Sequence, residues 1–327
     1  MTLLDMSLSK VTFLKSRPLT FPSRAFLLSK RHFSASTKSC QDFSELEKIP
    51  LKDVKQDFAQ YEGGSVTLIS ADRGHARISF ENAGKKNAIS GRMMVQLNDI
   101  ARELEAEQDA LKSWSLVSED SPGNSGRKKV FCAGGDMTTV AKICHPDFGY
   151  LMARLMHDTV VRLRSLPLLS AALVDGRGLG GGAELPLFAD FRVFTGHASL
   201  AFIEANVGVS TGWGGGKLLT DIVGPARALN CLLSCRKIGA EEALSVGLCD
   251  VIAEDEEDKI RALDDLISEM CERHQPEIVK AARSIVHSGV SAPGSLAEAL
   301  RRERQHFAPL WGGPANLKVL EKVLKKT

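Results

Sequence analysis

Polar and apolar residues alternate with two distinct periods along most of this chain. Residues 76–82, ARISFEN, place Ala76, Ile78 and Phe80 on one side and polar residues on the other, which is the spacing of a β-strand. Residues 91–108 instead repeat apolar positions every three or four residues, which predicts an amphipathic helix. Because strand and helix patterns alternate, the sequence favours an α/β fold with a largely parallel sheet.

Further segments follow the same two patterns. We expect strands at 114–118, 168–174, 191–195 and 199–203, and helices at 149–166, 225–237, 240–247, 256–273 and 276–286. Pro167 ends the helix that precedes it. After about residue 224 the pattern becomes purely helical. The sequence therefore predicts an α/β core followed by a helical C-terminal part.

The composition is that of a globular protein, with 43% hydrophobic and 25% charged residues among 327. A net charge of +2 gives no reason to expect nucleic acid or an anionic membrane as partner. No apolar run approaches the roughly 20 residues that span a bilayer. The seven cysteines lack any C-x-x-C and the eight histidines lack H-E-x-x-H, so we expect no disulfide scaffold and no metal site.

Residues 1–40 differ from the rest of the chain. They carry seven basic residues against the single acid Asp5, with many Ser and Thr. That composition is typical of a mitochondrial transit peptide, so we expect a targeting segment there and the mitochondrial matrix as location. A basic, disordered tail on a cytosolic protein is the alternative. Residues 41–60 would form an N-terminal lead-in to the core.

The run LVDGRGLGGGAELPLFADF at residues 173–191 is rich in glycine. Gly176, Gly178 and Gly181 match G-x-G-x-x-G after a predicted strand, which is typical of dinucleotide binding. That function needs an acidic residue at the end of the next strand, which instead runs into Gly196. The glycines are therefore better explained by a use of the backbone itself.

Two glycine turns could supply backbone donors. A strand that ends in glycines and turns into a helix leaves unpaired N–H groups at the helix N-terminus. Two such groups directed at one oxygen form an oxyanion hole, which stabilises a developing enolate. We expect the turn FCAGGD at residues 131–136 also to follow a strand, and it is the candidate for the second donor.

Four stretches occur in the order and spacing of one family, namely ARISFENAGKKNAIS, VFCAGGDM, LPLLSAALVDGRGLGGGAELPLFADFRV and GVSTGWGGGKLL. The chain resembles the enoyl-CoA hydratase/isomerase, or crotonase, superfamily over roughly residues 61–255. The resemblance implies a crotonase core, a spiral of βα units, followed by a helical region at 256–327 that serves trimer contacts and covers CoA. It also implies an acyl-CoA thioester as substrate, no cofactor beyond the CoA of that substrate, and a homotrimer or homohexamer.

The resemblance assigns roles to individual positions. Gly135 and Gly181 match the two oxyanion amides, and Glu184 and Glu204 match the two acid/base glutamates of hydratases. Positions expected to contact the substrate or its CoA are Lys86, Gly135, Asp136, Met137, Thr138, Gly181 and Trp213. Glu184 could instead cap its own helix, and Glu204 could be a partly exposed glutamate at a strand end. For Trp213, a candidate wall of the acyl pocket, ordinary core packing is the alternative.

The stretches YEGGSVTL and LWGGPANL resemble the members of the superfamily that decarboxylate malonyl-type thioesters. The resemblance thus implies a lyase that removes the carboxyl group of ethylmalonyl-CoA and of methylmalonyl-CoA through a thioester enolate. Glu204 departs from that group, which usually carries another residue there. Because both glutamates are present, an enoyl-CoA hydratase is the first alternative. A non-catalytic acyl-CoA-binding protein is the second, and Glu184 argues against it.

Overall fold

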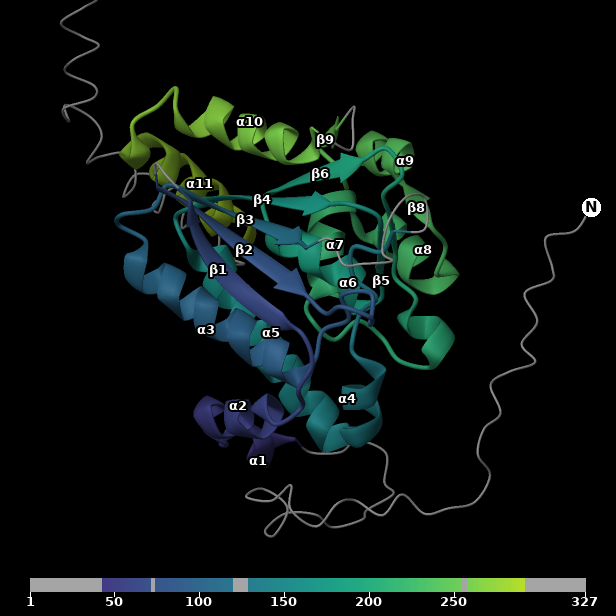
Figure 1. Cartoon of the computed structure of the whole chain (residues 1–327). Helices are drawn as coiled ribbons and strands as arrows, with labels where there is room; N and C mark the ends of the chain where they lie inside the picture. The colour runs from purple at the N-terminus through teal and green to yellow at the C-terminus, as the bar shows by residue number, and fades with distance from the viewer. Residues whose placement is uncertain (1–42, 72–73, 120–128, 254–257, 292–327) are drawn as a thin grey trace, which may run out of the picture. The chain divides into compact units, whose positions relative to one another are not determined.

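The computed structural model describes residues 43–71, 74–119, 129–253 and 258–291, which Figure 1 draws as helices and strands. The expected targeting segment and the end of the expected C-terminal helical region lie outside these described residues. The domain boundaries given above stay predictions. None of the helices within the described ranges is both long and apolar enough to cross a membrane.

A six-stranded sheet forms the centre of the fold (Figure 1), with strand order β1-β2-β3-β4-β6-β9. Its strands are β1 (Ser65–Ala71), β2 (His75–Glu81), β3 (Ser113–Ser118), β4 (Leu169–Val174), β6 (Phe191–Thr195) and β9 (Val251–Ala253). Neighbouring strands are parallel except β1 and β2, which are antiparallel. The carboxyl ends of the parallel strands therefore meet at one edge, where open α/β sheets bind their ligands.

A second sheet of three short strands has the order β5-β7-β8. Its strands are β5 (Arg177–Leu179), β7 (Ser199–Ala201) and β8 (Ile238–Gly239). The sequence did not predict β5, which lies inside the glycine-rich run. Strand β7 was predicted within residues 199–203, whereas β5 and β8 are too short to show an alternating pattern and are defined only by their partners in space.

Helices connect the strands and cover the main sheet. They are α1 (Ser44–Glu47), α2 (Leu51–Ala59), α3 (Gly91–Glu107), α4 (Met137–Lys142), α5 (Pro146–Ser165), α6 (Gly181–Glu184), α7 (Gly215–Val223), α8 (Pro225–Ser234), α9 (Ala240–Ser245), α10 (Lys259–Cys271) and α11 (Pro276–Ser291), with 3₁₀ helices η3 (Leu185–Phe188) and η4 (Glu204–Val207). Helices α3 and α5 lie side by side (Figure 1). Helix α10 packs Leu263 and Ile267 against Val117 and Leu173 on one face of the sheet.

The predicted strands and helices of the core are confirmed, with ends that shift by a few residues. The prediction that the chain is purely helical after about residue 224 is wrong, because β8 and β9 lie in that part. Strand β9 has only three residues, and it pairs with β6 from far away in the sequence. Such a strand exists because the sheet edge offers it hydrogen bonds, which no local pattern reveals.

One buried carboxylate fixes α11 to the sheet. Asp190, just before β6, bonds to Arg283 Nε at 2.7 Å and to His287 Nε2 at 2.7 Å. It also accepts the Ser170 N–H at 3.0 Å. Burial opposes the ionisation of Asp190, but the bonds from His287 and Arg283 outweigh it and hold the pKa of Asp190 well below its usual range.

We therefore expect Asp190→Ala to lower the free energy of unfolding by about 3–5 kcal/mol at pH 7, because it leaves buried Arg283 without its counter-ion. The difference in the free energy of unfolding between the parent and Asp190→Ala is fully present above the ordinary carboxyl pKa of 3.8. It decreases as the pH falls below that value. Urea unfolding at pH 7 and pH 3 measures both. Asp221→Ala, which breaks the pair with exposed Lys217, is the control and should change stability by less than about 1 kcal/mol.

Candidate active site

Two glycine turns meet at the ligand-binding edge, and, contrary to expectation, the second does not directly follow a strand among the described residues. The first leaves β4, contains β5 and enters α6 at Gly181 through Gly180, whose φ is +55°. The second, residues 131–136, contains Gly134, whose φ is +90°, followed by Gly135. A positive φ strains residues that carry a side chain, so the two reversals favour glycine.

Backbone contacts hold the two turns side by side. The Leu179 N–H donates to the carbonyl of Cys132 at 2.9 Å. A Cβ built on Gly182 would lie 2.2 Å from that same carbonyl oxygen, so only glycine fits there. A Cβ built on Gly134 would lie 3.4 Å from the nitrogen of Gly181. The two turns are thus in direct contact through their main chains.

The amides of Gly135 and Gly181 are available for a ligand. Within the described part of the chain, neither N–H donates to another backbone group. Gly181 is the first residue of α6, where helix geometry leaves the N–H without a partner. The structure places the two donors on adjoining turns, as an oxyanion hole requires. Their role in catalysis stays a prediction.

The segment after β2 holds the second turn from its other side. The carbonyl of Lys86 accepts the Ala133 N–H at 3.0 Å, and Lys86 itself has a φ of +54°. The Ile89 N–H donates to the Gly134 carbonyl at 2.8 Å, and the Ile89 carbonyl accepts the Asp136 N–H at 2.9 Å. The side chain of Lys86 is exposed, and its expected contact with CoA stays a prediction.

Lys85, which the sequence analysis missed, contacts the expected substrate-binding turn. Its Nζ bonds to Asp136 Oδ2 at 2.7 Å and to Thr138 Oγ1 at 3.0 Å. Asp136 also accepts the Thr138 N–H at 2.8 Å and so caps α4. Burial opposes the ionisation of Asp136, but the bonds from Lys85 and Thr138 outweigh it and lower its pKa. Met137 is 73% exposed beside this turn. The adjacent residues Lys85 and Lys86 have the same side chain, so the sequence does not show which of them bonds to Asp136.

Glu184 is buried one helical turn after Gly181 and accepts hydrogen bonds from a distant loop. Its Oε2 accepts the N–H groups of Trp213 at 2.9 Å and Gly215 at 2.6 Å, and its Oε1 accepts that of Gly212 at 3.4 Å. The alternative that Glu184 caps its own helix is therefore wrong. Burial, together with the charge of nearby Glu204, raises the pKa of Glu184 to about 7 against the pull of these donors. A carboxyl with this pKa can give or take a proton at neutral pH.

Glu204 opens η4 close to Glu184 and is 9% exposed. The alternative of a partly exposed glutamate is therefore wrong. Among the described residues, neither of its carboxyl oxygens meets a hydrogen-bond donor at normal geometry. A Cβ built on Gly180 would lie 3.8 Å from Oε1 of Glu204, so this carboxyl borders the first glycine turn. Burial raises the pKa of Glu204.

Trp213 is 4% exposed and packs across both glycine turns. A Cβ built on Gly181 would lie 2.5 Å from its Cζ3, and one built on Gly135 would lie 3.9 Å from its Cζ2. The ring is therefore a core residue and a wall of the candidate site at once. The motif TGWGGG drew attention to Trp213 in the sequence, and only the tertiary structure shows that its ring lies against Gly135 and Gly181.

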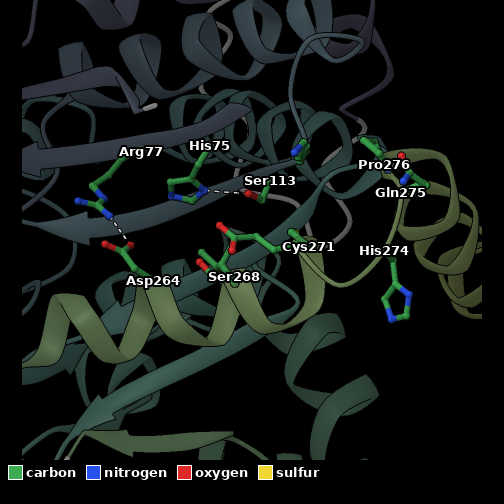
Figure 2. A pocket seen from close by; sticks show the side chains of 12 residues that line it. His75, Arg77, Ser113, Asp264, Ser268, Cys271, His274, Gln275 and Pro276 are labelled. Atoms are coloured by element: carbon green, nitrogen blue, oxygen red, sulfur yellow. Dashed lines mark hydrogen bonds and ion pairs between the residues drawn. The ribbon is translucent and has the colours of Figure 1, made fainter. Parts of the chain in front are cut away.

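A cavity of about 640 Å³ lies at the opposite end of the parallel strands (Figure 2). His75 and Ser113, the first residues of β2 and β3, bond there at 2.9 Å, and Arg77 pairs with Asp264 at 2.5 Å. Burial and the nearby charge of Arg77 lower the pKa of His75 to about 4, so this ring is neutral at pH 7. Because the first glycine turn follows the carboxyl end of β4 and the second contacts the first, this cavity is separate from the candidate active site.

The fold and the paired turns define a class of protein, and comparison with known proteins agrees. The family model for enoyl-CoA hydratase/isomerase matches residues 71–311, and the chain belongs to this family. The crystal structure of enoyl-CoA hydratase from Bacillus anthracis covers 80% of this chain and 96% of its own, with a TM-score of 0.70 at 23% identity. An enoyl-CoA hydratase structure from Geobacillus kaustophilus gives a TM-score of 0.71 at 22% identity over 80% and 94%. The expected crotonase fold is confirmed.

More similar in sequence are several proteins named ethylmalonyl-CoA decarboxylase. The one from Xenopus laevis is 36% identical over 278 residues, which are 83% of this chain and 87% of that protein. The one from Homo sapiens is 33% identical over 273 residues, which are 83% and 85% of the two chains. The expected resemblance to these decarboxylases is confirmed.

The buried carboxyl of Glu204 leads to a prediction about stability. Its raised pKa means that burial of this carboxyl destabilises the fold; the effect is absent below the ordinary value of 4.5, grows as the pH rises from 4.5 to the raised pKa, and is constant above it. We expect Glu204→Gln to be more stable than the parent at pH 8, with little difference at pH 4, because Gln carries no charge to bury. Urea unfolding at the two pH values measures this. Glu241→Gln, on the exposed face of α9, should show no such difference, and equal effects of the two variants would contradict the assignment.

Proposed function

We propose that this chain decarboxylates ethylmalonyl-CoA and methylmalonyl-CoA. The observation that carries the proposal is the pair of unpaired amides, Gly135 and Gly181, on adjoining turns beside a buried carboxyl. The names of the related proteins from Xenopus laevis and Homo sapiens support ethylmalonyl-CoA as the substrate. The thioester carbonyl is itself the electron sink, so the reaction needs no group beyond the protein and the CoA substrate.

In the proposed reaction the two amides hold the thioester oxygen. The bond from the α-carbon to the carboxylate breaks, CO₂ leaves, and the electron pair moves into an enolate whose oxygen the amides stabilise. The carboxylate must lie out of the carbonyl plane in a poorly solvated pocket, which Trp213 and the glycine turns border. Glu184, with a pKa of about 7, then gives a proton to the α-carbon.

A second candidate function is enoyl-CoA hydration, because Glu184 and Glu204 lie close together beside the same turns. A hydratase uses one carboxylate to take a proton from water and one carboxyl to give a proton to the α-carbon. Decarboxylation requires only the second of these roles. The two functions therefore differ in their dependence on Glu204.

We expect the purified full chain to release CO₂ from ethylmalonyl-CoA and methylmalonyl-CoA and to hydrate crotonyl-CoA slowly or not at all. Glu184→Gln should lower the rate of CO₂ release by about 10²–10⁴-fold, because it removes the proton donor. Glu204→Gln should keep the rate within about tenfold of the parent, because the second carboxyl is not required. Coupled CO₂ assays and the absorbance of the enoyl thioester measure the two activities.

Three outcomes would contradict this proposal. Fast hydration of crotonyl-CoA without CO₂ release, abolished by Glu204→Gln, would make the chain a hydratase. Tight binding of acyl-CoA with no product from any of these thioesters would make it a binding protein. An unchanged rate of CO₂ release in Glu184→Gln would show that Glu184 is not the proton donor.

We also propose that the chain forms a homotrimer or homohexamer. Helix α8 contacts η4, and large apolar side chains are exposed on both and just after η4, namely Val207, Val209, Leu229 and Leu233. Light scattering should give three or six times the chain mass of 35.4 kDa. Leu233→Glu should shift the protein toward monomer, because it places a charge on this apolar surface. Val161→Glu on α5 is the matched control, and a monomeric parent would contradict the proposal.

A further inference from the structure

The candidate active site holds two carboxyls, although the proposed decarboxylation needs only one. In hydration, the oxygen of water bonds to the β-carbon of an enoyl thioester, one proton of that water goes to a carboxylate, and a carboxyl proton goes to the α-carbon. Glu184 and Glu204 could perform these transfers if water and the β-carbon met beside them. Any group that fills this space decides which of the two reactions takes place.

The indole of Trp213 occupies space directly against the oxyanion turns. Three of its ring carbons, Cζ3, Cε3 and Cη2, lie 2.5–2.8 Å from a Cβ built on Gly181. Its Cζ2 lies 3.9 Å from a Cβ built on Gly135. The ring thus spans the two residues whose amides would hold the thioester oxygen. Trp213 is 4% exposed and Glu184, which accepts its backbone N–H, is 2% exposed, so bulk water barely reaches either side chain.

The loop that carries Trp213 is fixed by Glu184. The Trp213 N–H donates to Oε2 at 2.9 Å, and the N–H groups of Gly212 and Gly215 bond to the same carboxyl. A Cβ built on Gly215 would lie 2.5 Å from Cγ of Glu184, so loop and carboxyl are in close contact. A carboxylate has about four lone-pair sites, and these backbone donors take three of them. Little acceptor capacity is left on Glu184 to orient a water molecule.

We propose that Trp213 is the specificity-determining residue that keeps this site a decarboxylase by excluding water and the extended enoyl chain from the two carboxyls. The inference rests on the proposed function. An apolar ring beside the breaking bond also favours decarboxylation, because the leaving carboxylate loses its charge as it becomes CO₂. The same ring excludes water, which is the nucleophile in hydration. Glu204 is then a carboxyl whose hydratase role is blocked by its surroundings.

The test compares two activities in one set of variants of the full chain. We expect Trp213→Ala to lower kcat/KM for CO₂ release from ethylmalonyl-CoA at least about tenfold and to raise hydration of crotonyl-CoA at least about tenfold over the parent. The double variant Trp213→Ala/Glu204→Gln should lose the gained hydration, because that reaction needs both carboxyls. Trp213→Phe, which keeps an aromatic ring beside Gly181, should gain much less hydration than Trp213→Ala.

Controls separate this role from a general effect on folding. Trp114→Phe is the control for Trp213→Phe, because it makes the same substitution at a fully buried tryptophan in β3. It should leave the ratio of CO₂ release to hydration unchanged. Trp213→Leu is the second variant if Trp213→Ala does not fold, as judged by circular dichroism, and it should shift the ratio in the same direction.

The outcomes distinguish this inference from the proposed function. If the parent releases CO₂ but neither Trp213→Ala nor Trp213→Leu gains hydration, the role of Trp213 is wrong and the proposed function stands. If Trp213→Ala/Glu204→Gln keeps the hydration gained by Trp213→Ala, the inference that Trp213 blocks a hydratase role of Glu204 is wrong. If the parent itself hydrates crotonyl-CoA and releases no CO₂, both the proposed function and this inference are wrong.

Discussion

The candidate active site depends on one close approach between two stretches of backbone. The carbonyl of Cys132 accepts the Leu179 N–H, and a Cβ built on Gly182 would lie only 2.2 Å from the same oxygen. Because no side chain fits between them, the two glycine turns meet main chain to main chain. This contact sets the amides of Gly135 and Gly181 on adjoining turns. A site made in this way uses rigid peptide groups as donors, and such donors need no reorganisation when charge develops on a substrate.

The buried acids of this protein divide by their partners. Asp190 and Asp175 bind cationic side chains, which lower their pKa values in spite of burial and tie α11 and α10 to the sheet. Glu184 and Glu204 form no salt bridge among the described residues, and burial raises their pKa values. The first pair of acids stabilises the frame, whereas the second pair lowers stability at neutral pH. Raised carboxyl pKa values of this kind are common where a group must transfer protons.

The sequence predicted the longer elements well, and the reason is visible in particular segments. In β2 and α3 the apolar residues recur with the period of a strand and of a helix, and most of them are buried, so the residue types alone indicate the element. Strands β5, β8 and β9 have two or three residues and were not predicted. They exist because another strand offers hydrogen bonds, and that information lies elsewhere in the chain. The same limit applies to Lys85, whose bond to Asp136 joins residues far apart in sequence.

By itself, the sequence determined the α/β class, the family resemblance, and the identity of the glycines and glutamates at the candidate site. These features are local, since motif spacing and side-chain chemistry can be read along the chain. Only the tertiary structure decided which groups meet. It places Glu184 under the N–H groups of the 212–215 loop rather than at its own helix start, and it lays the Trp213 ring over both glycine turns. Contacts of this kind depend on how distant segments pack, and no one-dimensional pattern encodes that packing.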